Sequence, residues 1–209
     1  MSARRIIDIS QTLRTGIAVW PGDTEFQSFW MMRMDRGDSC NVGSVTMSLH
    51  TGTHADAPLH FLAGGASPDS ADLSAHIGPA EVIDLSGVHA IDKSHIGALA
   101  SVSRERLLFK TGTAQADSFN RDFSYFTKDA ALEIVKLGAV LVGIDTPSVD
   151  KSDSQTLEAH KVFAAANVAV LENLVLDSVT PGRYELVALP LKLAGMDASP
   201  IRAILRTLE

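Results

Sequence analysis

The sequence predicts an α/β protein that forms one domain around a mixed β-sheet. Short strand-like segments dominate the first half of the 209 residues, and helix–strand pairs fill the second half. No internal repeat, low-complexity segment or linker divides the chain, so we expect a single domain over residues 1–209. A chain of this length, with 45% hydrophobic and 21% charged residues, can bury a sizeable core.

The first half shows several short strand patterns. The segment SVTMSLH alternates apolar and polar residues, which predicts a strand with one buried face. A Pro-Gly pair ends the extended segment GIAVWPGD in a turn. The expected extended segments are residues 4–10, 16–23, 44–50, 80–86 and 106–111.

The second half alternates between helical and strand patterns. Residues 127–138 have helical spacing, with Thr127 as N-cap and Gly138 at the end. The apolar run over 139–150 is typical of a strand covered on both faces. The remaining expectations are a helix over 154–167, a strand over 168–173 and a last strand over 184–193.

Charge and composition exclude several classes of function. The net charge of −7 argues against nucleic acids and anionic membranes as partners. A single cysteine, Cys40, excludes an intrachain disulfide and a cysteine-cluster metal site. The start MSARRIIDIS lacks the apolar stretch of a signal peptide, and no apolar run approaches the roughly 20 residues that span a bilayer. We therefore expect a cytoplasmic protein.

Three of the seven histidines cluster in LHTGTHADAPLHF, residues 49–61. His50, His54, Asp56 and His60 share one parity and would lie on one face of a straight strand. Four strand residues span about 13 Å, which is too far for two ligands of one metal ion. We therefore expect a sharp bend at Gly52 that brings His50 and His54 together. The alternative is a histidine-rich surface loop that binds no metal. The small residues between the histidines and the acid Asp56 among them disfavour this alternative.

The ligand types narrow the choice of metal. Mixed histidine and carboxylate ligation suits Zn²⁺ or Mn²⁺ and leaves a position open for water. Glu172 lies in an apolar strand, where a carboxylate is costly unless it is paired or coordinated. His160, on an alanine-rich helix, is by itself more often an interior or boundary histidine than a metal ligand, and spacing alone selects neither residue. His76, His89 and His95 lie in polar or turn-like segments without nearby acids, so we expect them to face solvent.

HTGTHADAPLHF resembles the HxGTHxDxPxHF motif of the metal-dependent cyclase-like amidohydrolases. Within them, the resemblance to the bacterial kynurenine formamidases runs nearly from end to end. The pairing of VWPGD near the start with LPLKLAGMDASP near the end is what points to the formamidases. Further matching segments are DIS, GIDTPSVD, HKVF, VLENL and PIRAIL.

This resemblance implies a swivelling β/β/α fold, a homodimer and two divalent metal ions, with zinc favoured over manganese. His50, His54 and Asp56 would hold the first ion. Asp56 would bridge to a second ion that is also held by His160 and Glu172. The resemblance further implies that His60 is the acid–base residue and that Trp20 lines the substrate pocket. The residues alone leave Trp20 equally suited to capping the edge of the core.

The activity implied is hydrolysis of N-formyl-L-kynurenine to L-kynurenine and formate, a step of tryptophan degradation. Isatin hydrolysis, or hydrolysis of another cyclic or aryl amide, is the nearest alternative. A non-catalytic metal protein is a remote one, because structural zinc sites favour cysteine ligands. The chain contains no G-x-S-x-G motif, so a serine-hydrolase mechanism is rejected.

Overall fold

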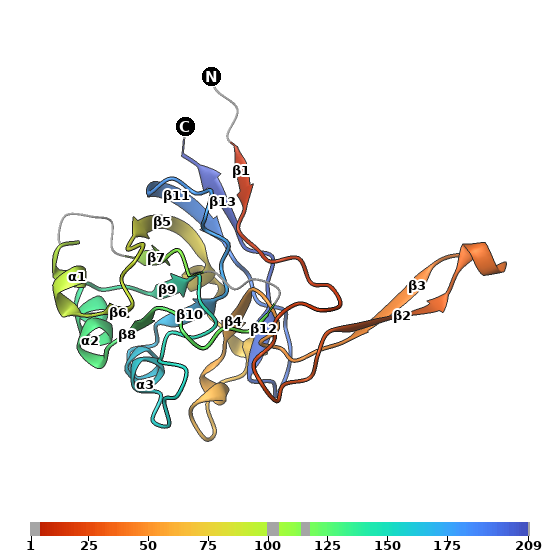
Figure 1. The fold of residues 1–209 in the computed structure, drawn as a ribbon, viewed down its shortest axis with the longest axis horizontal. Helices are drawn as coiled ribbons and strands as arrows, with labels where there is room; N and C mark the ends of the chain where they lie inside the picture. Colours follow the sequence, from red (N-terminus) through yellow and green to blue (C-terminus); the bar gives the residue numbers. More distant parts are fainter. Residues whose placement is uncertain (1–4, 100–104, 114–117, 209) are drawn as a thin grey trace.

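A nine-stranded mixed sheet organises the protein, as the computed structural model shows (Figure 1). The structure describes residues 5–99, 105–113 and 118–208. The sheet order is β1-β13-β11-β5-β7-β9-β10-β4-β12, with the run from β5 to β10 parallel and the flanking pairs antiparallel. Its strands are β1 (Ile6–Asp8), β4 (His54–Asp56), β5 (Ile77–Asp84), β7 (Arg106–Lys110), β9 (Leu141–Ile144), β10 (Ala169–Glu172), β11 (Gly182–Val187), β12 (Ala198–Pro200) and β13 (Ile204–Thr207). The mixed α/β architecture that the sequence predicts is confirmed.

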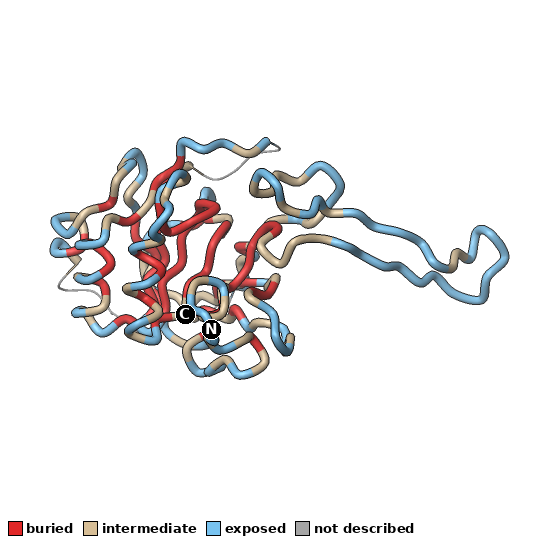
Figure 2. The backbone as a smooth tube through the Cα atoms, turned by 90° about the horizontal axis from the view of Figure 1, so that it is seen from below, coloured by how far each residue is buried: buried red, intermediate tan, exposed pale blue. Residues whose placement is uncertain are grey.

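The helices cover one face of this sheet (Figure 1). They are α1 (Lys93–Gly97), α2 (Lys128–Lys136) and α3 (Glu158–Ala165), and the short strands β6 (Ala90–Ile91) and β8 (Tyr125–Phe126) pair beside them. Because strand side chains alternate between faces, Leu107 and Phe109 pack toward the helices and Leu108 packs on the opposite face. Figure 2 shows these strands as the buried centre of the molecule. Within the described residues no helix is long and apolar enough to cross a membrane.

Most of the expected elements are confirmed with shorter bounds. In α2 the Thr127 hydroxyl accepts the N–H of Ala130, and Gly138 ends the helical segment with a φ of +83°. All four residues of β9 are buried, as the apolar run predicts. The strand expected over 184–193 is not the last, because β12 and β13 follow it. Arg4, at the start of the first expected strand, and the rest of residues 1–4 lie outside the described residues.

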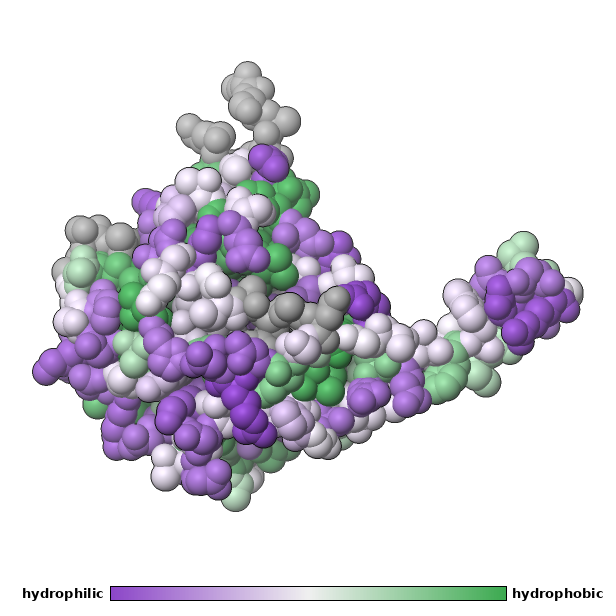
Figure 3. Space-filling view, viewed as in Figure 1, coloured by the Kyte–Doolittle hydropathy of each residue, from purple (hydrophilic) through white to green (hydrophobic). Residues whose placement is uncertain are grey.

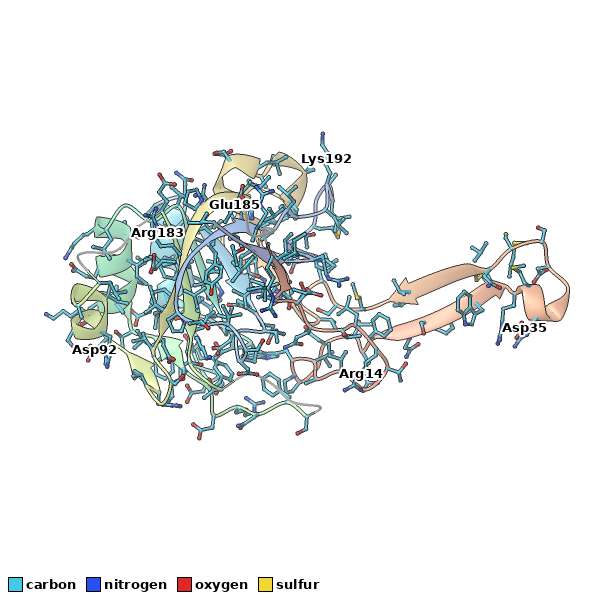
Figure 4. The ribbon with its side chains drawn as sticks, turned by 90° about the horizontal axis from the view of Figure 1, so that it is seen from above. Arg14, Asp35, Asp92, Arg183, Glu185 and Lys192 are labelled. Atoms are coloured by element: carbon cyan, nitrogen blue, oxygen red, sulfur yellow. The ribbon has the colours of Figure 1, made fainter. Side chains whose placement is uncertain are left out.

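A long hairpin projects from the sheet as a separate arm (Figures 1 and 2). It is made of β2 (Gln27–Met32) and β3 (Val42–Thr46), joined through a short 3-10 turn at Met34–Arg36. Asp35 lies at its far end (Figure 4). Apolar groups lie along its length beside a hydrophilic tip (Figure 3).

The half-buried strand expected over 44–50 is therefore wrong in two respects. The strand ends at Thr46, and both of its faces are exposed, with Val45 57% accessible. Alternation predicts the strand correctly, but burial needs a covering layer, and a two-stranded ribbon has none within one chain. The segment over 16–23 forms no strand, although its expected turn is present, with Asp23 N–H donating to Trp20 C=O at 2.9 Å.

Candidate metal centre

The register of three strands assembles the centre of the site. Strand β4 lies between β10 and β12 and pairs antiparallel with both. On one side this register sets Glu172 directly opposite His54, and on the other it sets Ala198 opposite Asp56. Cross-strand partners lie within about 5.5 Å of each other, so pairing alone delivers Glu172 to the histidine cluster.

The bend expected at Gly52 is confirmed. Gly52 has a φ of +66°, a conformation that glycine adopts without steric cost. The chain turns at Leu49–His50 before β4 begins at His54. As a result His50 Nδ1 and His54 Nε2 lie 3.1 Å apart, although a straight strand would hold these two residues too far apart to share a metal ion.

Each histidine of the cluster is held by its outer ring nitrogen. The Nδ1–H of His54 donates to the Gly52 carbonyl at 2.9 Å, so in the neutral ring the lone pair lies on Nε2 of His54. His50 Nε2 lies 3.1 Å from an Asp197 carboxylate oxygen. Oriented in this way, imidazoles present their inner nitrogens as metal ligands, and such supporting contacts are typical of metal sites.

Asp150 holds His160 in the same manner. Its carboxylate accepts the backbone N–H groups of Ala159 and His160, and so caps the start of α3. The same carboxylate lies 2.6 Å from His160 Nδ1. The inner nitrogen of His160, Nε2, is then directed at Asp56 and Glu172, at 3.1 and 3.2 Å.

The inner atoms are spaced as ligands around a metal ion would be. Asp56 Oδ1 lies 3.3 Å from His50 Nδ1 and 3.3 Å from His54 Nε2. Ligands bonded at 2.0–2.1 Å around a tetrahedral ion are separated by about 3.3 Å. Asp56 Oδ1 is buried and has no hydrogen-bond partner, so these approaches are not hydrogen bonds. The orphaned oxygen and the facing nitrogen lone pairs fit a bound cation.

Asp56 and Glu172 each direct one carboxylate oxygen toward His54 and the other toward His160. Asp56 directs Oδ1 toward His50 and His54 and Oδ2 toward His160. Glu172 lies 3.3 Å from His54 through Oε2 and 3.2 Å from His160 through Oε1. The arrangement therefore has room for two cations that share carboxylate ligands.

The electrostatics of the cluster also favour positive charge. Burial by itself disfavours the protonated form of His54, but the carboxylates of Asp56 and Glu172 outweigh it and raise the pKa of His54. Against the penalty of burial, His160, His50 and His54 hold the pKa of the Asp56 carboxyl well below its usual range. The two buried carboxylates thus require positive charge beside them, which either protonated histidines or a bound metal ion can supply.

His60 lies beside the cluster and faces an open cavity. It ends the 3-10 turn Pro58–His60, and its Nδ1 is 3.5 Å from an Asp197 oxygen. Burial lowers the pKa of His60, so its imidazole is neutral near pH 7. With His50 and Asp56 it forms a second group of converging donor atoms, so its geometry is also compatible with ligation.

A cavity of about 590 Å³ opens onto these residues. His60, His160 and Glu172 form part of its wall, and Trp20 forms an aromatic part. Phe119 lies edge-on to Trp20 with ring centroids 5.0 Å apart and lines the same cavity. The volume suits a small ligand with an aromatic ring.

The structure brings all the expected site residues to one place and adds Asp150 and Asp197. The sequence held only a weak signal for these two residues. GIDTPSVD and GMDASP both contain aspartate, but neither contains a histidine that would mark it as part of a metal site. The solvent-facing position expected for His76 is wrong. It is 4% exposed, and its backbone carbonyl accepts the N–H of Ala188 just after β11, so this residue lies against the sheet.

Comparison with known sequences gives a consistent set of relatives. A family profile described as "Putative cyclase" matches residues 7–151. The kynurenine formamidase of Salinibacter ruber is 44% identical over 205 residues, which cover 96% of this chain and 97% of that protein. The kynurenine formamidase of Erythrobacter litoralis is 44% identical over 209 residues, which cover 99% of this chain and 96% of that protein.

Solved structures share the fold over nearly the whole chain. One, described as a potential metal-dependent hydrolase with cyclase activity, has a TM-score of 0.86 and 33% identity, covering 99% of this chain and 100% of that one. Isatin hydrolase A from Labrenzia aggregata, bound to benzyl benzoate, has a TM-score of 0.86 and 25% identity. That alignment covers 99% of this chain and 95% of the other.

Proposed function

This chain belongs to the cyclase family, and from that membership and the geometry of its site we propose that it hydrolyses N-formyl-L-kynurenine to L-kynurenine and formate. The reaction is a step of tryptophan degradation. The observation that carries the proposal is the convergence of three histidine nitrogens and two carboxylates at the end of an aromatic cavity. The choice of substrate rests on the kynurenine formamidases that are 44% identical over nearly the full chain.

We assign a divalent metal to the cluster, in agreement with the similar hydrolase described as metal-dependent. His50, His54 and one oxygen of Asp56 would hold a first ion. The other Asp56 oxygen, with His160 and Glu172, would hold a second. Zn²⁺ is the first candidate and Mn²⁺ the second, because histidine and carboxylate ligands suit both. A bound metal of this kind acidifies water toward a pKa of about 7 and polarises a carbonyl oxygen.

The chain's own residues supply proton transfer and orientation. Hydrolysis of an aryl formamide requires a proton on the departing aniline nitrogen as the C–N bond breaks. His60 is neutral near pH 7 and faces the cavity, so its imidazole can take a proton from water and deliver it to that nitrogen. The formyl group is small, so recognition falls on the aryl ketone, for which Trp20 offers a flat apolar face.

We further propose that the protein is a cytoplasmic homodimer and that its arm takes part in the contact. Phe29, Trp30 and Met31 on β2 are 50%, 58% and 69% exposed. A two-stranded ribbon that carries large apolar side chains is marginal in water, and a second copy of the chain would cover them.

The test is hydrolysis of N-formyl-L-kynurenine by the purified protein, with metal content determined on the same sample. Chelator-sensitive turnover with close to two metal ions per chain is the expected result. Isatin is assayed in parallel, because the isatin hydrolase fold match makes it the second candidate substrate. Full metal occupancy with turnover of isatin alone would replace the formamide with a cyclic amide.

A further inference from the structure

The cavity contains one acidic side chain that the hydrolysis itself does not use. We infer that Asp23 binds the α-ammonium group of the amino-acid substrate and so selects amino-acid formamides over simple aryl formamides. This inference rests on the proposed formamidase function. Asp23 lines the same cavity as Trp20 and His60, so a substrate held by both of these can also reach Asp23.

The position of Asp23 is set by the turn that carries Trp20. The backbone N–H of Asp23 donates to the Trp20 carbonyl at 2.9 Å, which closes the turn at the Pro-Gly pair. One short turn therefore presents an aromatic face and a carboxylate to the same cavity. The substrate has the matching pair of groups, an aryl ketone and an α-ammonium, joined by a single methylene and the α-carbon.

Ser48 fixes the carboxylate relative to the metal centre. Its hydroxyl donates to Asp23 Oδ2 at 2.8 Å and accepts the backbone N–H of His50 at 3.3 Å. Asp23 is therefore connected to His50 through one side chain, and its position relative to the reacting end is defined. Its second carboxylate oxygen receives no hydrogen bond from the described residues.

The other two carboxylates of the cavity wall are already engaged. Glu172 is buried between His54 and His160, and it also accepts the backbone N–H of Val149 at 2.8 Å. Asp197 directs one oxygen at both His50 and His60, at 3.1 and 3.5 Å. Asp23 instead contacts a neutral hydroxyl, so among the described residues of the lining it is the acid whose carboxylate faces no imidazole.

The charge of the lining favours an ammonium group over a carboxylate. Among the described residues that line the cavity there is no lysine or arginine, whereas three are acids. None of the described lysines and arginines forms an ion pair with Asp23. Away from the metal centre, the charged side chains that the described lining offers are acids, so the ammonium end of an α-amino acid is the end that finds a counter-charge there.

The experiment compares two substrates in the metal-loaded wild-type enzyme and in Asp23→Asn. N-formyl-L-kynurenine carries the α-ammonium, and 2-formamidoacetophenone has the same aryl ketone and formamide without the amino-acid end. We expect Asp23→Asn to raise KM for the first substrate by about 10- to 100-fold with kcat nearly unchanged, as loss of a charge-assisted contact made equally in ground and transition states would. For the second substrate, kcat/KM should change by less than about twofold.

Glu25→Gln is the matched control, since it removes one exposed negative charge two residues away that does not line the cavity. It should leave both substrates unaffected. An equal loss on both substrates in Asp23→Asn, or no loss on either, would overturn the inference while leaving the formamidase function intact. A metal-loaded wild-type enzyme that hydrolyses neither formamide would overturn the proposed function, and the inference with it.

Discussion

Gly52→Ala should damage both the stability and the metal site, because Gly52 makes the bend between His50 and His54. An alanine at a φ of +66° costs about 1–2 kcal/mol in backbone conformation. Its Cβ would also lie 2.8 Å from Leu13 Cδ2 and 3.3 Å from Ile17 Cδ1. Overpacking of this kind costs about 1–3 kcal/mol, and a partly exposed leucine that can shift favours the lower end. We expect a loss of about 2–4 kcal/mol in the free energy of unfolding.

Gly16→Ala is the matched control, since Gly16 has a φ of +82° with no atom within 4 Å of the added Cβ. It should lose only the backbone cost of about 1–2 kcal/mol and keep its metal. Urea unfolding of both metal-free variants gives the stabilities without a contribution from metal binding. Metal titration then reports the site, where Gly52→Ala should bind at least about tenfold more weakly, because the Gly52 carbonyl orients His54. Equal stability and wild-type metal affinity in the two variants would refute the role of the bend.

Three further predictions concern the site, the arm and α1. His60→Ala should keep its metal and lose most turnover, whereas His54→Ala should lose both; metal analysis beside activity checks this, and a metal-free His60→Ala would make His60 a ligand. Trp30→Asp should weaken self-association, seen by light scattering as a shift toward monomer, and an unchanged mass would remove the arm from the contact. Asp92 immediately precedes α1, and hydrogen bonds from Ser94 lower the pKa of its carboxyl from 3.8 to about 2. Its carboxylate is therefore favoured in the folded state, so the stability it adds is present above pH 3.8 and lost as the pH falls through about 2. The stability gap between wild type and Asp92→Asn, measured by urea unfolding, should be constant above about pH 5 and narrow below pH 4, and a gap that does not depend on pH would contradict this.

The extent to which the site could be predicted depended on how local its geometry is. The bend at Gly52 follows from residues 50–56 alone, because ligand spacing excludes a straight strand and only glycine adopts the bend freely. Glu172 was suspect as a carboxylate in an apolar strand, but its partner His54 is set by the antiparallel pairing of β10 with β4. His160 gave no local sign, since its orientation depends on Asp150, ten residues earlier.

The sequence by itself determined the α/β class, most of the helix and strand positions and the histidine cluster, since periodicity, capping and ligand chemistry act over a few residues. Tertiary structure alone decided what is buried and what faces what. The alternating strand at residues 44–46 belongs to an exposed arm, and His76, in a polar segment, is buried. Asp197 reaches His50 and His60 from the far end of the chain only because β12 pairs with β4. Burial and cross-strand contact depend on which surfaces meet, and that is a property of the whole fold.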